Sequence, residues 1–358
     1  MRRAVIDIGT NTVKLLVADV EDGTVTPIIH LDETTRLGEG LMAQAATGHS
    51  TGPSRTRDSC PDQIAGARFD WPRSSWSREK SRETVAPRLS PAAIVRTVAA
   101  IARYAAEAHR RGARDVIALT TSATRSAGNA GEFLEAVRRQ CGLEVQVLSG
   151  DREAELIFRG VASDPLYVGQ RLLVMDVGGG SAEWVLGRAG ASERLCSLPL
   201  GAVRLLERFG DNDFVALAAH LRAALAGSLA AFRAGPWRMI GTGGAAVTLA
   251  NIVGQASRLS GLEKMDKRDA YPTETLDKWD AYPTGIDHAH LTLEALRALV
   301  TQLNALPLAD RRRVPGLPPE RADIIVPGAA VFLFAMERLG ASDLSVSVRS
   351  LRFGALLE

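Results

Sequence analysis

The sequence AVIDIGTNT at residues 4–12 is repeated in outline by LVMDVGGGS at residues 173–181. In each, an apolar run typical of a buried strand ends at an aspartate, and a turn of glycines and small hydroxyl side chains follows. A second strand is predicted after each turn, over residues 13–20 and 182–186. Glycines let backbone amides approach an anion closely, so each turn has the composition of a phosphate-binding loop. The turns could instead need glycine only for their shape, but their repetition favours two loops that grip one phosphate chain.

The glycine-rich turns supply most of the candidate ligand-binding residues. For phosphate these are Gly9, Thr10 and Asn11 in the first turn, and Gly178, Gly179, Gly180 and Ser181 in the second. The aspartates at the two strand ends, Asp7 and Asp176, are candidates for holding a divalent cation or its water shell. A third turn, MIGTGG at residues 239–244, follows a short apolar run and adds Gly241, Thr242 and Gly243. Glycine in such a strand-to-helix turn is often only structural.

Two further blocks, TTSATRSAGN at residues 120–129 and SGDREAELIF at residues 149–158, follow predicted strands at 116–119 and 144–148. Ligands in open α/β sheets gather outside the carboxyl ends of the strands, so both blocks are placed near a binding site. Arg125 can form a forked contact with a phosphate. Ser149 or Asp151 can cap a helix over residues 152–161, which puts Glu153 in its first turn. The helix dipole alone also favours a glutamate there.

Taken together, these segments resemble the exopolyphosphatase and guanosine pentaphosphate phosphohydrolase family, Ppx/GppA, whose motifs they match in order. Further matches are LPLGAVR at residues 198–204, RADIIVPGA at 321–329 and VSVRSLRFGALL at 346–357. The resemblance covers most of the chain. It implies an α/β fold of two ribonuclease-H-like domains, as in the actin, sugar kinase and chaperone ATPase superfamily, with a cleft between them.

The resemblance also predicts the domain organisation. The first domain is expected over residues 1–152, joined by residues 345–358, and the second over residues 153–344. Two stretches, about 46–87 and 255–286, depart from the short connections of the family and are interpreted as surface insertions. The second contains the near repeat DKRDAYPT and DKWDAYPT. Their Trp and Tyr residues could instead dock a partner or cover the cleft. Helices are predicted over residues 91–111, 129–140, 201–209, 213–234, 291–306 and 322–339.

The implied reaction is hydrolysis of a terminal phosphoanhydride of inorganic polyphosphate or guanosine pentaphosphate, with release of orthophosphate. By the resemblance, Glu153 is the catalytic glutamate, although Arg152 precedes it where many relatives carry Glu or Gln. Mg²⁺ is expected to be held by Asp176 and Glu183, with Asp7 as a further candidate ligand. Arg125 is expected to steady the transferred oxygens.

Composition restricts the class of protein. The chain has 358 residues, 46% hydrophobic, with a net charge of +2, which indicates a soluble two-domain protein without duplex nucleic acid as its main partner. Apolar runs are too short to span a bilayer and no secretory signal is present, so a cytoplasmic protein is expected. Arginine far outnumbers lysine, and Arg125, Arg204, Arg349 and Arg352 are candidates for a local lane that guides a polyanion.

The remaining candidate ligand residues carry less information. Cys60, Cys141 and Cys196 have unrelated spacings and are interpreted as unpaired thiols. His288 and His290 lie close together but border a predicted insertion without other ligand-type residues beside them, so a loop role is predicted.

Three other functions stay open. An ATP-dependent kinase or ATPase of the same superfamily would use the same loops, with the turn at residues 241–244 facing adenosine. A non-catalytic actin-like protein would bind nucleotide without turnover, and an alarmone-binding protein would bind guanosine tetraphosphate without cleaving it. The blocks at 120–129 and 149–158 favour the phosphohydrolase. Many relatives form homodimers, and a homodimer is therefore a further expectation.

Overall fold

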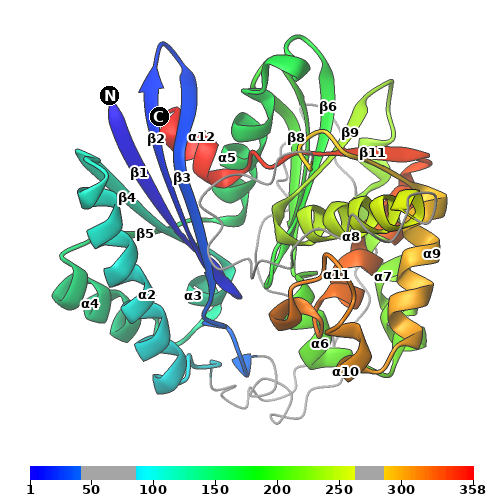
Figure 1. Ribbon diagram of the computed structural model, residues 1–358, viewed down its shortest axis with the longest axis horizontal. Coiled ribbons are helices and arrows are strands. Elements are labelled where there is room, and N and C mark those ends of the chain that lie inside the picture. Colours follow the sequence, from blue (N-terminus) through cyan, green and yellow to red (C-terminus); the bar gives the residue numbers. More distant parts are fainter. Residues whose placement is uncertain (42–85, 263–285) are drawn as a thin grey trace, which may run out of the picture.

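The computed structural model describes residues 1–41, 86–262 and 286–358. Two α/β halves lie side by side, each built on its own sheet, with the first half on the left of Figure 1 and the second on the right. The insertion predicted at 46–87 lies outside the described residues except for its last two. Of the one predicted at 255–286, residues 255–262 form the end of helix α8 (Gly243–Leu262), and residues 263–285 lie outside the described residues. Among the described helices, none is long and apolar enough to cross a membrane.

The first sheet has the strand order β3-β2-β1-β4-β5. Its strands are β1 (Arg2–Ile8), β2 (Thr12–Glu21), β3 (Thr24–Thr34), β4 (Asp115–Thr120) and β5 (Val145–Val147). The helices of this part of the chain are α2 (Pro91–Arg110), α3 (Ser122–Ser126), α4 (Ala130–Cys141) and α5 (Gly150–Ala162). Apolar residues of β1 and β2 and of α2 and α4 form one core on the outer face of the sheet.

The second sheet has the strand order β10-β11-β9-β6-β7-β8. Its strands are β6 (Arg171–Val177), β7 (Ala182–Arg188), β8 (Ala191–Leu198), β9 (Arg238–Thr242), β10 (His290–Thr292) and β11 (Asp343–Val346). The helices are α6 (Ala202–Phe209), α7 (Phe214–Ser228), α8 (Gly243–Leu262), α9 (Leu293–Ala305), α10 (Leu308–Arg311), α11 (Ile325–Leu339) and α12 (Leu351–Leu356). Three short 3₁₀ turns are η1 (Pro165–Tyr167), η2 (Ala230–Phe232) and η3 (Pro319–Arg321).

The two sheets share one topology. The order β3-β2-β1-β4-β5 of the first corresponds to β8-β7-β6-β9-β11 of the second. In both, the first two strands form an antiparallel hairpin, and the strand that follows along the sheet is parallel to the first. The predicted fold class, two ribonuclease-H-like α/β domains, is therefore correct.

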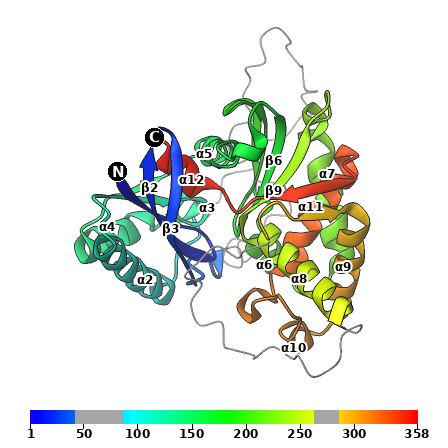
Figure 2. The ribbon, with the colours of Figure 1, turned by 45° about the horizontal axis from the view of Figure 1, so that its top comes forward.

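Helices α5 and α12 lie between the two sheets (Figure 2). One core joins apolar residues of both sheets, such as Val5 and Val185, to Leu156 of α5 and Phe353 of α12. Helix α5 packs against β7 and β8, whereas α12 packs against β1 and α5. The domain boundary predicted at residue 152 falls inside α5 and stays a prediction.

The contact between α5 and α12 depends on two glycines. A Cβ on Gly160 would lie 2.1 Å from the carbonyl oxygen of Ser350, and one on Gly354 would lie 1.9 Å from that of Leu156. These are backbone atoms that cannot rotate away. The absence of side chains at the two positions therefore sets how closely the helices approach.

Most predicted elements are present, with three differences at helix ends. The helix predicted over 291–306 begins with strand β10, because Leu291 pairs with β11, and α9 starts only at Leu293. The helix predicted over 213–234 ends at Ser228 and continues as η2. The helix predicted over 322–339 starts at Ile325, after η3. Of the cysteines, Cys141 and Cys196 are not joined in a disulfide, and Cys60 lies outside the described residues.

Candidate active site

The two predicted phosphate loops are the same four-residue turn. Between β1 and β2, the Gly9 amide donates to the Thr12 carbonyl at 3.0 Å, and between β6 and β7 the Gly178 amide donates to the Ser181 carbonyl at the same 3.0 Å. Each turn closes an antiparallel hairpin. The sequence repeat is therefore a structural repeat, one loop in each half.

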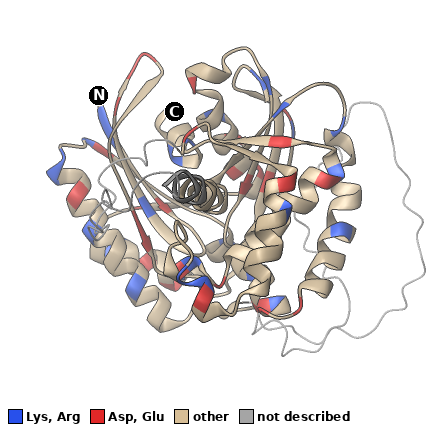
Figure 3. Cartoon of the chain, turned by 45° about the vertical axis from the view of Figure 1, so that its right-hand side comes forward, with Lys and Arg blue, Asp and Glu red and all other residues tan. Residues whose placement is uncertain are grey.

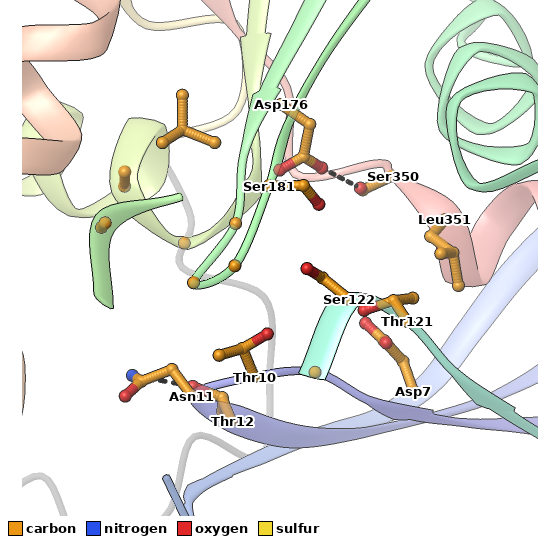
Figure 4. A pocket seen from close by; sticks show the side chains of 18 of the residues that line it. Asp7, Thr10, Asn11, Thr12, Thr121, Ser122, Asp176, Ser181, Ser350 and Leu351 are labelled. Carbon is orange, nitrogen blue, oxygen red and sulfur yellow. Dashed lines mark hydrogen bonds between the residues drawn. The ribbon is translucent and has the colours of Figure 1, made fainter. Parts of the chain in front are cut away.

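The loops meet across the boundary between the halves. A Cβ on Gly180 would lie 2.6 Å from Thr10 Oγ1 and 2.5 Å from Ser122 Oγ, and one on Gly179 would lie 3.2 Å from the amide nitrogen of Asn11. A larger side chain would force the loops apart. Both loops line a cavity of about 90 Å³. Figure 4 shows Thr10 and Asp7 on one side of this space and Asp176 and Ser181 on the other.

Three buried carboxylates line the same cavity. Ser149 caps α5, with its hydroxyl accepting from the Arg152 amide at 3.1 Å, and this places Glu153 in the first turn. Asp176 and Glu183 are cross-strand partners in the β6–β7 hairpin. The side chain of Asp176 accepts a hydrogen bond of 2.8 Å from Ser350 Oγ, at the start of α12.

The equivalent register in the first half pairs Asp7 with Lys14. Asp7 thus corresponds to Asp176, and Lys14 to Glu183. The duplicated hairpins keep the aspartate but differ in charge at the facing position. Burial lowers the pKa of Lys14, and the nearby Asp7 carboxylate opposes that change.

Burial raises the pKa values of the carboxyl groups. The pKa of Glu153 is raised well above its usual value by desolvation and then by the negative charge of Glu183, while Arg125 acts in the opposite direction. Arg125 Nη1 lies 3.3 Å from Glu153 Oε2 and also donates to the Leu148 carbonyl at 2.7 Å. Desolvation and the charge of Asp176 likewise raise the pKa of Glu183 to about 7. The cluster can therefore take up a proton near neutral pH, or a cation that compensates its charge.

A second cavity of about 290 Å³ adjoins the first, and Lys14, Arg321 and Ser350 line both. Arg352, 5% exposed, lines only the second cavity and donates to the Leu15 carbonyl and to the His30 ring. Desolvation and the charges of Arg352 and Lys14 lower the pKa of His30. Acidic and basic positions are mixed along both halves (Figure 3), so these buried cations are not part of a generally basic protein.

The second cavity also has apolar lining residues, which are Val247, Ile286, Pro318 and Val348. The amide of Asn251, on α8, lines the cavity as well and donates to the Gly316 carbonyl. The lining of the second cavity therefore combines cationic and apolar side chains.

Most of the predicted site residues come together around the first cavity. Those that line it are Asp7, Gly9, Thr10, Asn11, Glu153, Asp176, Gly178, Gly179, Gly180, Ser181 and Glu183. Arg125 reaches the site through Glu153, and Gly243 lines the second cavity. Their functional roles stay predictions.

Other predicted residues lie away from both cavities. Gly241 packs against Leu344 and Phe332 in the core, and the Thr242 hydroxyl donates to the Arg349 carbonyl. Arg349 itself binds the carbonyl of Ser163 and is not part of a lane to the cavity. These positions in the third turn and in the C-terminal segment serve packing, and only the later glycines of the third turn reach a cavity.

Sequence reasoning missed several cavity residues. The matched motifs contain four further residues that line the cavity, although none was predicted to do so: Thr121, Ser122, Arg321 and Ser350. Lys14 had a usable signal, because it is a charged residue inside an apolar strand run directly after the first loop.

The acidic cluster suits a divalent cation. Asp176, Glu183 and Asp7 supply hard oxygen donors, and within the described residues Thr10 Oγ1 and Asn11 Oδ1 are buried without a hydrogen-bond partner. Mg²⁺ keeps several waters and needs only one or two carboxylates. The three carboxylates are not, however, among the described groups whose ligand atoms already lie close enough to share one ion.

Among the described residues, the group whose ligand atoms do lie close enough to share one ion is Asp164, Asp287 and His288. This corrects the expectation that His288 lacks ligand-type neighbours. His288 Nε2 lies 2.8 Å from Asp164 Oδ2, and Arg349 Nε lies 3.6 Å from the same oxygen. The Arg349 cation already compensates the charge of Asp164. We therefore interpret these residues as structural contacts that connect η1 to the segment before β10.

Comparisons with known proteins give a family match and several similar proteins. The family model described as "Ppx/GppA phosphatase family" matches residues 78–358. Exopolyphosphatase 1 of Mycobacterium leprae is 28% identical over 366 residues, which cover 100% of this chain and 89% of that protein. An uncharacterised protein of Streptomyces coelicolor is also 28% identical, over 100% of this chain and 90% of its own length.

Solved structures show the same fold. The Aquifex aeolicus member of the Ppx/GppA family superposes with a TM-score of 0.68 at 25% identity, over 100% of this chain and 96% of that one. An exopolyphosphatase from Cytophaga hutchinsonii has a TM-score of 0.74 at 23% identity, over 99% and 96% of the two chains. At that identity the second likeness concerns the fold alone.

Proposed function

Since the chain belongs to the Ppx/GppA phosphatase family, we propose that it hydrolyses the terminal phosphoanhydride bond of inorganic polyphosphate, guanosine pentaphosphate or both, and releases orthophosphate. The observation that carries this proposal is that two glycine turns closed by the same hydrogen bond line one cavity together with the buried Glu153 carboxylate. A terminal phosphoryl group held between the loops would lie next to a proton acceptor. A proton acceptor next to the phosphoryl group is one of the requirements for attack by water.

Glu153 is the proposed general base. Its raised pKa brings its proton affinity closer to that needed for accepting a proton from water near neutral pH. Arg125, which contacts it, keeps the carboxylate oriented and adds positive charge beside the transferred group. The loops would bind the phosphoryl oxygens through their amides and through the Thr10, Asn11 and Ser181 side chains.

Mg²⁺ is the proposed cofactor, held by Asp176 and Glu183 with Asp7 as a further ligand. When bound, it would neutralise charge that develops on the phosphoryl and leaving oxygens. Ser350 orients Asp176 from α12 through its 2.8 Å hydrogen bond. Lys14 and Arg125 compensate only part of the negative charge of the carboxylate cluster, so a bound cation would compensate the rest.

The second cavity is the proposed place for the rest of the substrate. Lys14, Arg321 and Arg352 suit further phosphates of a polyphosphate chain. The apolar lining residues, Val247 and Pro318 among them, suit the nucleoside of guanosine pentaphosphate. Both substrates present the same terminal phosphoanhydride to the first cavity and differ only in the part that the second cavity would hold. Which of them is preferred therefore has to be measured.

The test is phosphate release from long-chain polyphosphate, guanosine pentaphosphate and ATP, measured side by side with Mg²⁺ titrated in. We expect orthophosphate from one or both of the first two and little from ATP. Dominant turnover of ATP would favour the kinase or ATPase alternative. Binding without phosphate release would instead favour the actin-like or alarmone-binding alternatives. We expect the enzyme to be cytoplasmic, and the same preparation tests the predicted homodimer by light scattering.

A further inference from the structure

The segment that follows β3 is attached to the first phosphate loop. The amides of Thr35 and Arg36 both donate to the Asn11 carbonyl, at 3.0 and 2.9 Å, and the Gly38 amide donates to the Thr10 carbonyl at 2.9 Å. A Cβ on Gly38 would lie only 2.4 Å from Thr10 Cγ2. The position of this segment and the position of the loop are therefore fixed together.

The same segment also binds the second half of the molecule. Arg36 Nη1 and Nη2 lie 2.7 and 3.1 Å from the two carboxylate oxygens of Asp323, a bidentate pair, and Nη2 also donates to the Glu320 carbonyl at 2.9 Å. Four residues beyond Arg36, the Gly40 amide donates to Glu207 Oε1 of α6 at 2.6 Å. Side chains of the ion pair are 32% and 18% exposed, so the charges are partly shielded from solvent.

Asp323 in turn belongs to a segment that covers the third glycine turn. Two residues before it, Arg321 packs on Gly244, where a Cβ would meet its guanidinium at 2.1 Å. Arg321 also lies 3.3 Å from Asp32 on β3, which is a second ion pair between the halves. The residues directly after Asp323, Ile324 and Ile325, line the first cavity.

Arg36 thus connects a phosphate loop of one half with the wall of the cavity contributed by the other. Besides the contacts between the loops, the Arg321–Asp32 ion pair and the Gly40–Glu207 hydrogen bond, the halves are joined by α5 and α12. These two helices lie near the top of Figure 1, whereas the chain beyond β3 runs toward the bottom of that view. We propose that Arg36 and Asp323 are positioning residues, a clasp that holds the two phosphate loops together over bound polyanion. This assignment goes beyond the proposed function, since it concerns how the cavity is closed.

Geometry explains why this pair, rather than the many surface pairs, has that role. Exposed ion pairs contribute little because solvent screens them and long side chains must be ordered. Here one guanidinium makes three hydrogen bonds in a fixed fork, and its own backbone amide is held by the loop it positions. Without the pair, the Gly40–Glu207 hydrogen bond and the Arg321–Asp32 ion pair remain to support α5 and α12 in joining the halves, so we expect the cavity to open more readily on the side of Arg36.

The test uses charge reversal and its rescue. Arg36 has a φ of 51°, a conformation that aspartate tolerates, so Arg36→Asp adds little backbone strain. With tripolyphosphate as substrate, we expect Arg36→Asp and Asp323→Arg each to raise KM by about ten-fold and to change kcat less, because the loops must first be brought together. The double variant, with the charges exchanged, should recover most of the parental KM.

A matched control is available one residue from Asp32. Glu33 on β3 pairs with Arg103 of α2 at 2.6 Å, within the first half and at an exposed position. Reversal of either of these charges should leave KM near the parental value. The conservative Arg36→Lys keeps the charge but loses the fork, and an intermediate KM is expected.

A second measurement does not depend on catalysis. In small-angle X-ray scattering, the single reversals should increase the radius of gyration, and the double variant should restore it. The assignment is overturned if the single variants keep the parental KM and radius, or if the exchanged pair behaves as badly as either single variant. Should the parent release no phosphate at all, the proposed function fails, while scattering and tripolyphosphate binding still decide on the clasp.

Discussion

At the scale of single residues, Glu153 combines two properties that normally conflict. It is 8% exposed and lies near other carboxylates, yet the proposed reaction requires it to activate water. A buried like-charge cluster costs stability, and it persists where a bound cation or a reaction uses it. A single variant of Glu153 can be used to measure both the effect of its carboxylate on the reaction rate and its effect on stability.

For the rate, Glu153→Gln keeps the shape of the side chain and removes the proton acceptor. We expect kcat to fall by about 10²- to 10⁴-fold, the usual contribution of a positioned general base. The control is Glu155→Gln, on the same helix, whose carboxylate pairs with Arg152 away from the cavity. A Glu153 variant that retains nearly parental turnover in a steady-state phosphate assay would contradict the assignment.

For stability, the same variant should be more resistant to heat than the parent. A carboxyl group whose pKa is raised by folding binds its proton more tightly in the folded than in the unfolded chain. Below the unfolded pKa of about 4.3 both states hold the proton, so the group has no effect; as pH rises through the folded pKa, stability is lost. Metal-free Glu153→Gln should therefore melt at a higher temperature at about pH 8, and the gain should vanish at about pH 4. Equal melting curves at both pH values would contradict the raised pKa.

At the scale of elements, the crossing of α5 and α12 connects packing with the site. Helix α5 carries Glu153 at its start, and α12 begins beside Ser350, which binds Asp176. Gly160 and Gly354 fix the separation of the helices. The position of the proposed base relative to the proposed metal ligand therefore depends on two residues that touch neither.

Replacing Gly354 by Ala tests this dependence. Its Cβ would meet the Leu156 carbonyl oxygen at 1.9 Å, so the helices must separate. We expect a loss of about 1–3 kcal/mol in the free energy of unfolding, as for overpacked cores, together with a lower kcat. The control is Gly227→Ala in α7, where a Cβ meets nothing within 4 Å; there helix propensity predicts a small gain in denaturant unfolding. Equal effects of the two substitutions would refute the role of the crossing.

The same elements show what the sequence could and could not predict. Strand runs, the two glycine turns and the cap of α5 were predictable, since hydrophobic periodicity and capping are local signals. The helix predicted over 291–306 was wrong at its start, because pairing of Leu291 with β11 is a tertiary contact. Gly241 and Thr242 were placed at the site because they belong to a glycine-rich turn after an apolar run, although their surroundings in the fold are core and the Arg349 backbone.

The second cavity was not predictable for a similar reason. Its cations, Lys14, Arg321 and Arg352, come from three distant parts of the chain and meet only after both halves fold. No local pattern reports such a meeting. By contrast, the two loops could be predicted from the sequence, because the duplicated hairpin repeats one sequence pattern.

At the scale of the whole molecule, ligand and metal should act as a bridge between the halves. The loops of both halves line one cavity, so a polyanion bound there contacts both. We expect tripolyphosphate with Mg²⁺ to raise the melting temperature, with about 2.7 kcal/mol of stabilisation at a hundredfold excess over Kd. Chelation with EDTA should abolish both this gain and turnover, and added Mg²⁺ should restore them. Undiminished turnover in EDTA would exclude the proposed cofactor.

The contacts between the N-terminal strand and the C-terminal helix also affect when the protein can fold during translation. The guanidinium of Arg3, in β1, donates to the carbonyl of Leu356, 353 residues later in the chain. While a ribosome is still extending the polypeptide, β1 has no such partner, and the face of its sheet that α12 later covers stays incomplete. Contacts of such long sequence separation slow folding. Assembly of the proposed catalytic centre must therefore wait until nearly all of this sequence has been translated.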